Sequence, residues 1–140
     1  MKRLTWWLRI VGAFYLLQFV MMVFVQAPIS AQGPAGALAL AAAGDPLAHF
    51  LVDTWVTFGL EVGAIGLGLL LASRLPAQSK PLVWTVILIE LARGIAADIY
   101  MLARGEKPAV LIPWLAIHVA IIVSGVFVLS MARGGEAMDV

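Results

Sequence analysis

The chain has 140 residues, of which 63% are hydrophobic and only 12% are charged. A soluble domain is typically about 45–50% apolar and about 25% charged. The composition therefore excludes intrinsic disorder, and it argues against a soluble enzyme because so small a fold cannot bury that much apolar surface. A net charge of +1 provides no basic surface for nucleic acid, and the lack of cysteine excludes disulfides and thiolate metal sites. The class that remains is an integral membrane protein, for which the lipid bilayer is an expected partner.

Four segments are apolar over about 20 residues, the length that a helix needs to cross a bilayer. They lie at about 6–26, 51–73, 82–103 and 109–131. We therefore predict an all-α protein, an integral membrane four-helix bundle that forms a single transmembrane domain over residues 1–140.

The first apolar segment could instead belong to a cleaved signal peptide. Lys2 and Arg3 would form its basic region, and Ala27 or Ala31 would lie near the cleavage site. The apolar run is longer than the roughly 7–15 residues of such a peptide, however. It also contains Tyr15 and Gln18. We expect the segment to be retained as a membrane span.

Residues 27–44 form a long first loop that is rich in alanine and glycine and carries no charge. Its stretch 37–43 is too short to span a membrane, so we predict a short interfacial helix in the first outer loop. Asp45 and Pro46 then predict the start of the second helix. An aspartate caps free backbone N–H groups there, and proline loses no hydrogen bond at the first helical position.

Proline and glycine also mark the later boundaries. Pro76 predicts a turn within residues 74–80, and Pro81 opens the third helix. Gly105 is typical of a position just past a helix end, and Pro108 predicts the start of the fourth helix. Pro113 is expected to bend that helix, because proline removes a backbone donor.

The distribution of lysine and arginine predicts the orientation of the chain. Six of these residues lie near the termini or in the second loop: Lys2, Arg3, Arg9, Arg74, Lys80 and Arg133. Only two, Arg104 and Lys107, lie in the third loop. Cytoplasmic loops carry the excess of positive charge. We therefore expect both termini in the cytoplasm (N-in/C-in) and a multi-pass protein of the cell inner membrane.

Several polar side chains lie within the predicted spans, where they are costly and usually face the bundle interior or water. Their estimated depths place them in one polar layer shared by the four helices, which we interpret as a ligand-binding site. Its central members are Gln18, Glu61, Glu90, Arg93 and His118, and Asp53 and Asp98, nearer the outer face, are expected to line a path that leads outward from it. We expect no metal site, because the two histidines, His49 and His118, are far apart along the bundle axis.

Helical spacing arranges these polar residues in two stripes. On the second helix the stripe is formed by Asp53, Thr57 and Glu61; on the third it is formed by Glu90, Arg93, Gly94, Ala97 and Met101. Glu90 and Arg93 are three residues apart and are expected to pair. The alternative is that this pair only fixes helix packing. Four acids against the single cation Arg93 nevertheless indicate a site that holds an extra proton, a cation or water.

The segment from Gly59 to Gln78 resembles the second-helix signature of the DoxX/DoxD-like four-helix membrane proteins. A glutamate, Glu61, is followed by Gly63, by a run of leucines at 69–71 and by Arg74 at the cytoplasmic turn. The stretch 89–94, with the sequence IELARG, is similar to related members. The resemblance implies an accessory or subunit role in a membrane redox system, and it carries over no catalytic residue.

These observations predict a small inner-membrane accessory or ligand-binding protein. Its polar site would bind a lipid, a quinone-like or other lipophilic molecule, or a partner subunit of a membrane redox complex. Two alternatives stay open, so the sequence does not decide whether the chain is an enzyme. One is an isomerase-like acid–base enzyme that acts on a lipid through Glu61, Glu90 or His118. The other is a proton-coupled transporter, formed by a homodimer or larger oligomer, in which Glu61 carries the proton.

Overall fold

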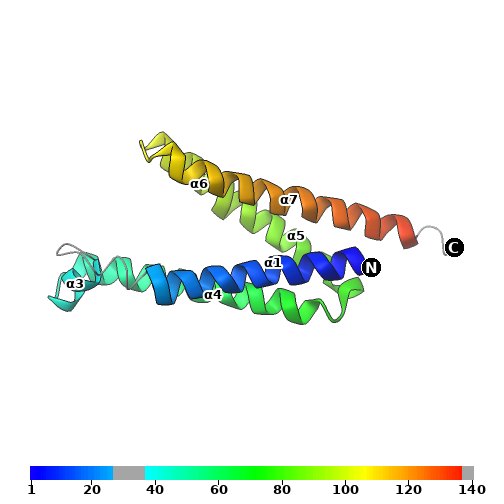
Figure 1. The fold of residues 1–140 in the computed structure, drawn as a ribbon, viewed down its shortest axis with the longest axis horizontal. Coiled ribbons are helices and arrows are strands. Elements are labelled where there is room, and N and C mark those ends of the chain that lie inside the picture. Colours follow the sequence, from blue (N-terminus) through cyan, green and yellow to red (C-terminus); the bar gives the residue numbers. More distant parts are fainter. Residues whose placement is uncertain (27–36, 137–140) are drawn as a thin grey trace. The chain divides into compact units, whose positions relative to one another are not determined.

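The computed structural model describes residues 1–26 and 37–136, and every regular element in these residues is helical (Figure 1). The all-α prediction is therefore confirmed. In chain order the elements are α1 (Lys2–Val20), η1 (Met21–Gln26), α3 (Ala37–Ala42), α4 (Pro46–Ala72), η2 (Pro76–Ser79), α5 (Lys80–Ile89), η3 (Glu90–Ile95), α6 (Ala96–Ala103) and α7 (Pro108–Glu136). η1 and η3 are turns of π-helix, and η2 is a short 3₁₀-helix.

Three helical segments are long and apolar enough to cross a membrane: Lys2–Phe24, Pro46–Ala72 and Pro108–Ala132. This finding supports the prediction of a membrane protein. The fourth predicted span, at about 82–103, corresponds to α5, η3 and α6, which follow one another without a break. Taken alone, α5 with 10 residues and α6 with 8 residues are each too short to cross, and the combined segment is not one of these three. The four-helix bundle and its orientation stay predictions.

The helix boundaries that proline, glycine and aspartate predicted are present. Oδ1 of Asp45 accepts a hydrogen bond of 2.8 Å from the backbone N–H of Ala48, so it caps α4 at Pro46. Gly44 and Gly105 follow α3 and α6 with φ of +88° and +92°, a conformation that glycine adopts without strain. The predicted helix at 37–43 is α3, and the preceding part of that loop, 27–36, lies outside the described residues.

The chain divides into two compact units. We call Ile10–Leu71 the first-hairpin unit, and Met1–Arg9 together with Ala72–Val140 the second-hairpin unit. Helix α1 contributes residues to both. Each unit is described by itself, and the single-domain prediction for residues 1–140 stays a prediction.

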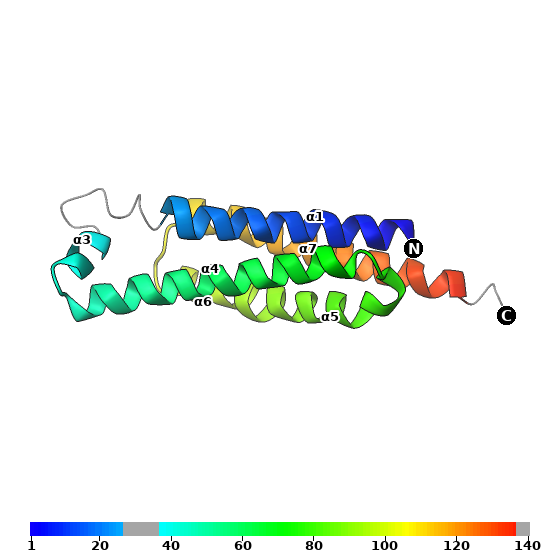
Figure 2. The same cartoon turned by 90° about the horizontal axis from the view of Figure 1, so that it is seen from below.

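In the first-hairpin unit, α1 and α4 run antiparallel and side by side (Figures 1 and 2). Glycine makes this approach possible, because a Cβ atom on Gly66 would lie 2.9 Å from both the carbonyl oxygen of Gly12 and the backbone nitrogen of Leu16. A Cβ atom on Gly63 would lie 2.9 Å from the ring of Phe19. Small residues allow membrane helices to pack closely in this way.

In the second-hairpin unit, α7 packs along α5, η3 and α6 (Figure 2). The first turns of α1 join this unit through Leu4, Trp7 and Leu8, which are buried. Nε1 of Trp7 donates a hydrogen bond of 2.9 Å to Oγ of Ser124 on α7. The start of α1 therefore lies beside the C-terminal half of α7.

Candidate acid–histidine site

The α5–η3–α6 segment buries one face that carries two carboxyl groups. Glu90, Gly94 and Asp98 are buried on this face at intervals of four residues. Residues eight positions apart on a straight α-helix would be rotated by about 80° from each other, at 3.6 residues per turn. A π-helical turn uses about one residue more than an α-helical turn, which reduces this rotation to roughly 20°. η3 therefore places both acids on the face that meets α7.

His118 of α7 lies between these two acids. Its Nδ1 is hydrogen-bonded to Oε2 of Glu90, and its Nε2 is 3.7 Å from Oδ2 of Asp98. The side chains of Glu90 and Asp98 are 5% and 8% exposed, and that of His118 is 17% exposed. The imidazole ring thus has a buried carboxyl group at each nitrogen.

Gly94 provides the space that the ring occupies. A Cβ atom on Gly94 would lie 2.5 Å from Nδ1 of His118 and 2.6 Å from Cγ. Because both distances are too short for real contacts, any larger residue would displace the ring from Glu90. The sequence placed Gly94 in the polar stripe, but nothing in its pattern identified it as the position that accommodates the histidine.

Oδ2 of Asp98 is buried and has no hydrogen-bond partner within the described part of the chain. An unsatisfied buried polar group costs about 1–3 kcal/mol, so such a group in a folded protein requires an explanation. The nearest candidate donor is Nε2 of His118, which is slightly too far away for a hydrogen bond. A movement of less than about 1 Å would form this bond.

The arrangement is suited to proton exchange. A neutral imidazole has one N–H donor and one acceptor nitrogen, and histidine exchanges these roles more readily than other side chains. With a carboxyl group at each nitrogen, a proton received on one side of the ring can leave on the other. In residues 1–26 and 37–136, no group of three histidine, aspartate or glutamate residues is arranged to hold a metal ion.

Three of the predicted site residues are therefore brought together: Glu90, Asp98 and His118. Arg93 is exposed and lies outside the buried face, as does Met101. The predicted stripe through Glu90, Arg93, Gly94, Ala97 and Met101 is wrong at these two positions, because it assumed a straight α-helix. The π-helical turn moves Asp98 into the stripe instead.

The other predicted site residues belong to the first-hairpin unit. Asp53 and Glu61 are exposed on α4, together with Thr57 between them, and Gln18 on α1 is half-buried. These three residues share an exposed face of α4, and their predicted part in a polar site stays a prediction. A polar layer shared by all four helices stays a prediction.

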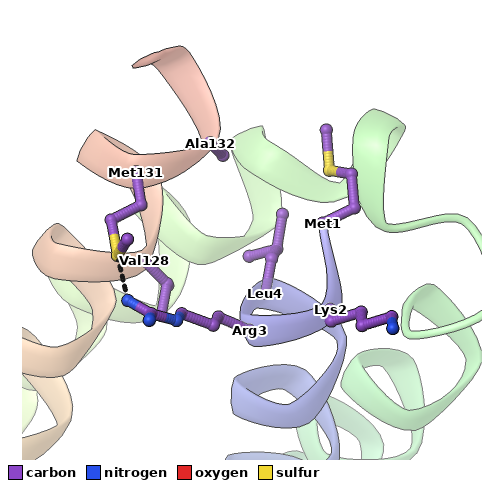
Figure 3. Close-up of a pocket in the computed structure, with 7 residues that line it drawn as sticks. All are labelled: Met1, Lys2, Arg3, Leu4, Val128, Met131 and Ala132. Atoms are coloured by element: carbon purple, nitrogen blue, oxygen red, sulfur yellow. Dashed lines mark hydrogen bonds between the residues drawn. The ribbon is translucent and has the colours of Figure 1, made fainter. Parts of the chain in front are cut away.

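A pocket lies near the C-terminal end of α7 (Figure 3). Its volume is about 380 Å³, and its lining residues are Met1, Lys2, Arg3, Leu4, Val128, Met131 and Ala132. Val128 is ten residues beyond His118, roughly 15 Å along the helix. None of Glu90, Asp98 and His118 lines this pocket, so it is a separate feature of the second-hairpin unit.

The fold and the site define a helical membrane protein with a buried acid–histidine cluster. Within this class, a family model described as BphX-like matches residues 1–134, and the chain belongs to that family. The predicted DoxX/DoxD-like membership is wrong. It depended on Glu61, Gly63, a leucine run and Arg74, a short pattern of residues that are common in membrane helices. No curated protein and no solved structure matches the chain.

Proposed function

We propose that this BphX-like protein is a small, multi-pass inner-membrane protein of the accessory or ligand-binding type. In this proposal, Glu90, His118 and Asp98 exchange a proton with a lipophilic molecule or a partner subunit bound beside them. Four membrane crossings and cytoplasmic termini belong to the same proposal. The observation that carries it is the position of His118, bonded to one buried carboxyl group and 3.7 Å from another.

The unsatisfied oxygen of Asp98 supports a functional role over a purely structural one. Ionisable groups inside a membrane are expensive, and chains of aspartate, glutamate and histidine often form proton relays. A cluster that served packing alone would gain stability by satisfying every polar atom. Here one carboxyl oxygen is left without a partner in the described residues, next to a group that can give or take a proton.

Contacts between α1 and α7 support an even number of membrane crossings. Trp7 is hydrogen-bonded to Ser124, and Nη1 of Arg3 donates to Sδ of Met131 at 2.7 Å. The first turn of α1 is therefore beside the last turns of α7. If both helices cross the membrane, the two ends of the chain lie on one side of it.

Proton-coupled transport is the second candidate function. His118 lies between the carboxyl groups of Glu90 and Asp98, so a proton that passes through its ring would move from one acid to the other along the helix. In this version the three residues of the second-hairpin unit carry the proton, in place of Glu61. The acid–base enzyme stays an alternative prediction, because the same groups can act as general acid and base.

The proposal is tested by following the protonation of His118 directly. The chain has two histidines, so the variant His49→Gln leaves His118 as the only one. We expect nitrogen-15 NMR of this variant in lipid bilayers to show ring protonation that changes with pH. Asp98→Asn should alter the Nε2 signal, Glu90→Gln should alter the Nδ1 signal, and the matched control Asp53→Asn should alter neither.

Two results would contradict proton exchange at this site. One is a ring whose protonation is constant at every pH at which the protein stays folded. The other is an Nε2 signal that is the same in Asp98→Asn and in Asp53→Asn. Native mass spectrometry of protein extracted from its membrane then tests whether a lipophilic molecule or a partner subunit accompanies the chain.

A further inference from the structure

The pocket at the start of α1 has a polar side and an apolar side. Lys2 and Arg3 are exposed, whereas Leu4, Val128 and Ala132 are buried. Figure 3 shows Leu4 standing between the two cations, with Arg3 extended toward Met131 and Lys2 extended in the opposite direction. The pocket therefore has two cationic side chains at its edge and buried aliphatic side chains at its base.

The two cations lack a carboxylate partner among the residues whose side chains the structure describes. Arg3 donates one hydrogen bond, to the thioether sulfur of Met131, which is a weak acceptor. The side chain of Lys2 makes no hydrogen bond or ion pair within the same residues. A guanidinium group has five N–H donors that match the oxygens of a phosphate, so most of the donors of Arg3 are available to a ligand.

The pocket also lies at the ends of two membrane-spanning segments. Lys2 is the first residue of the segment Lys2–Phe24, and Ala132 is the last residue of the segment Pro108–Ala132. Helix ends of this kind lie at the level of the lipid headgroups. A ligand in this pocket would therefore meet the membrane surface with its polar part and the hydrocarbon region with its apolar part.

We propose that this pocket binds an anionic phospholipid, with the phosphate at Arg3 and Lys2 and the start of the acyl chains on Leu4, Val128 and Met131. The proposal is independent of the acid–histidine site, whose residues do not line the pocket. Each cation near an anionic membrane surface strengthens attraction by an amount that corresponds to about fivefold in affinity. A zwitterionic lipid has no net charge, so these cations should attract it less strongly.

Binding is measured by native mass spectrometry of the full chain in detergent, titrated with phosphatidylglycerol or with phosphatidylcholine. We expect phosphatidylglycerol to bind more tightly, and Arg3→Gln and Lys2→Gln each to weaken it by about fivefold. Both residues are exposed, so neither change should affect folding. Lys107→Gln is the matched control, since it removes the same charge from an exposed residue between α6 and α7.

A second pair of variants tests the pocket without removing a cation. Met131→Glu places a carboxylate next to Arg3, so it should abolish the preference for phosphatidylglycerol. Met131→Leu keeps the apolar wall and should retain the preference. The proposal is overturned by equal binding of the two lipids, or by a loss in Lys107→Gln as large as that in Arg3→Gln. Displacement of phosphatidylglycerol by millimolar inorganic phosphate would also overturn it, because the ligand would then be free phosphate.

Discussion

His118 has a different relation to each of its two acids. It is hydrogen-bonded to Glu90, whereas the facing oxygen of Asp98, 3.7 Å from the ring, accepts no hydrogen bond within the described residues. The first contact stabilises the fold, because a hydrogen bond to a charged group contributes about 1.5–3 kcal/mol. The second lacks this stabilisation, because an unsatisfied buried polar group costs about 1–3 kcal/mol. The two acids should therefore respond in opposite ways when their charge is removed.

We predict that Glu90→Gln lowers the free energy of unfolding by about 1–1.5 kcal/mol, because a neutral bond replaces a charge-assisted one. Asp98→Asn should leave stability unchanged or raise it, since an unsatisfied buried carboxyl group is removed. Reversible unfolding in mixed micelles measures both variants. An equal loss of unfolding free energy in the two variants would show that Asp98 is hydrogen-bonded as well as Glu90 is.

Composition and helical spacing were enough to identify Glu90, Asp98 and His118 as candidates, but not to pair them. Their spacing of three residues predicts a pair between Glu90 and Arg93, which stays a prediction. The contact with His118 joins residues 28 positions apart. Such a contact depends on how two helices face each other, which a single sequence does not specify.

At the level of the helices, local signals predicted ends better than interiors. Asp45, Pro46, Gly105 and Pro108 mark boundaries because each acts on its own backbone. The π-helical turn of Glu90–Ile95 has no such signal, since its residues, ELARGI, are compatible with an ordinary α-helix. What distinguishes it is the burial of Glu90 and Asp98 against one histidine, a tertiary requirement.

Two glycines on α4 allow a direct test of helix packing. We predict that Gly66→Ala destabilises the first-hairpin unit by about 1–3 kcal/mol, because its new Cβ atom would lie 2.9 Å from backbone atoms of α1. Gly68 has nothing within 4 Å, so Gly68→Ala should be neutral or gain up to about 1 kcal/mol from helix propensity. Thermal unfolding of both variants provides the comparison. A Gly66→Ala protein as stable as Gly68→Ala would argue against the close contact of α1 with α4.

For the whole molecule, the number of membrane crossings depends on the segment that follows the first hairpin. Three segments have the length and hydropathy of a span. The segment from Lys80 to Ala103 is continuous through η3 and measures roughly 35 Å, at about 1.5 Å per residue. This length exceeds the hydrocarbon core of about 30 Å. Glu90 and Asp98 make the segment less apolar, but both acids are buried and α7 packs against the part of the segment that carries them.

We predict that this segment crosses the membrane, so that its two ends lie on opposite sides. Gln78 precedes it and Glu106 follows it; both are exposed, and the chain contains no cysteine that would interfere with labelling. The excess of lysine and arginine near Gln78 predicts that this end is cytoplasmic. In intact cells, an impermeant thiol reagent should therefore label Glu106→Cys and not Gln78→Cys, and both should react after the cells are opened. The same labelling state at both positions in intact cells would mean that the segment does not cross. Labelling of Gln78→Cys alone would reverse the orientation, and with it the side of the membrane from which Lys2 and Arg3 meet their lipid.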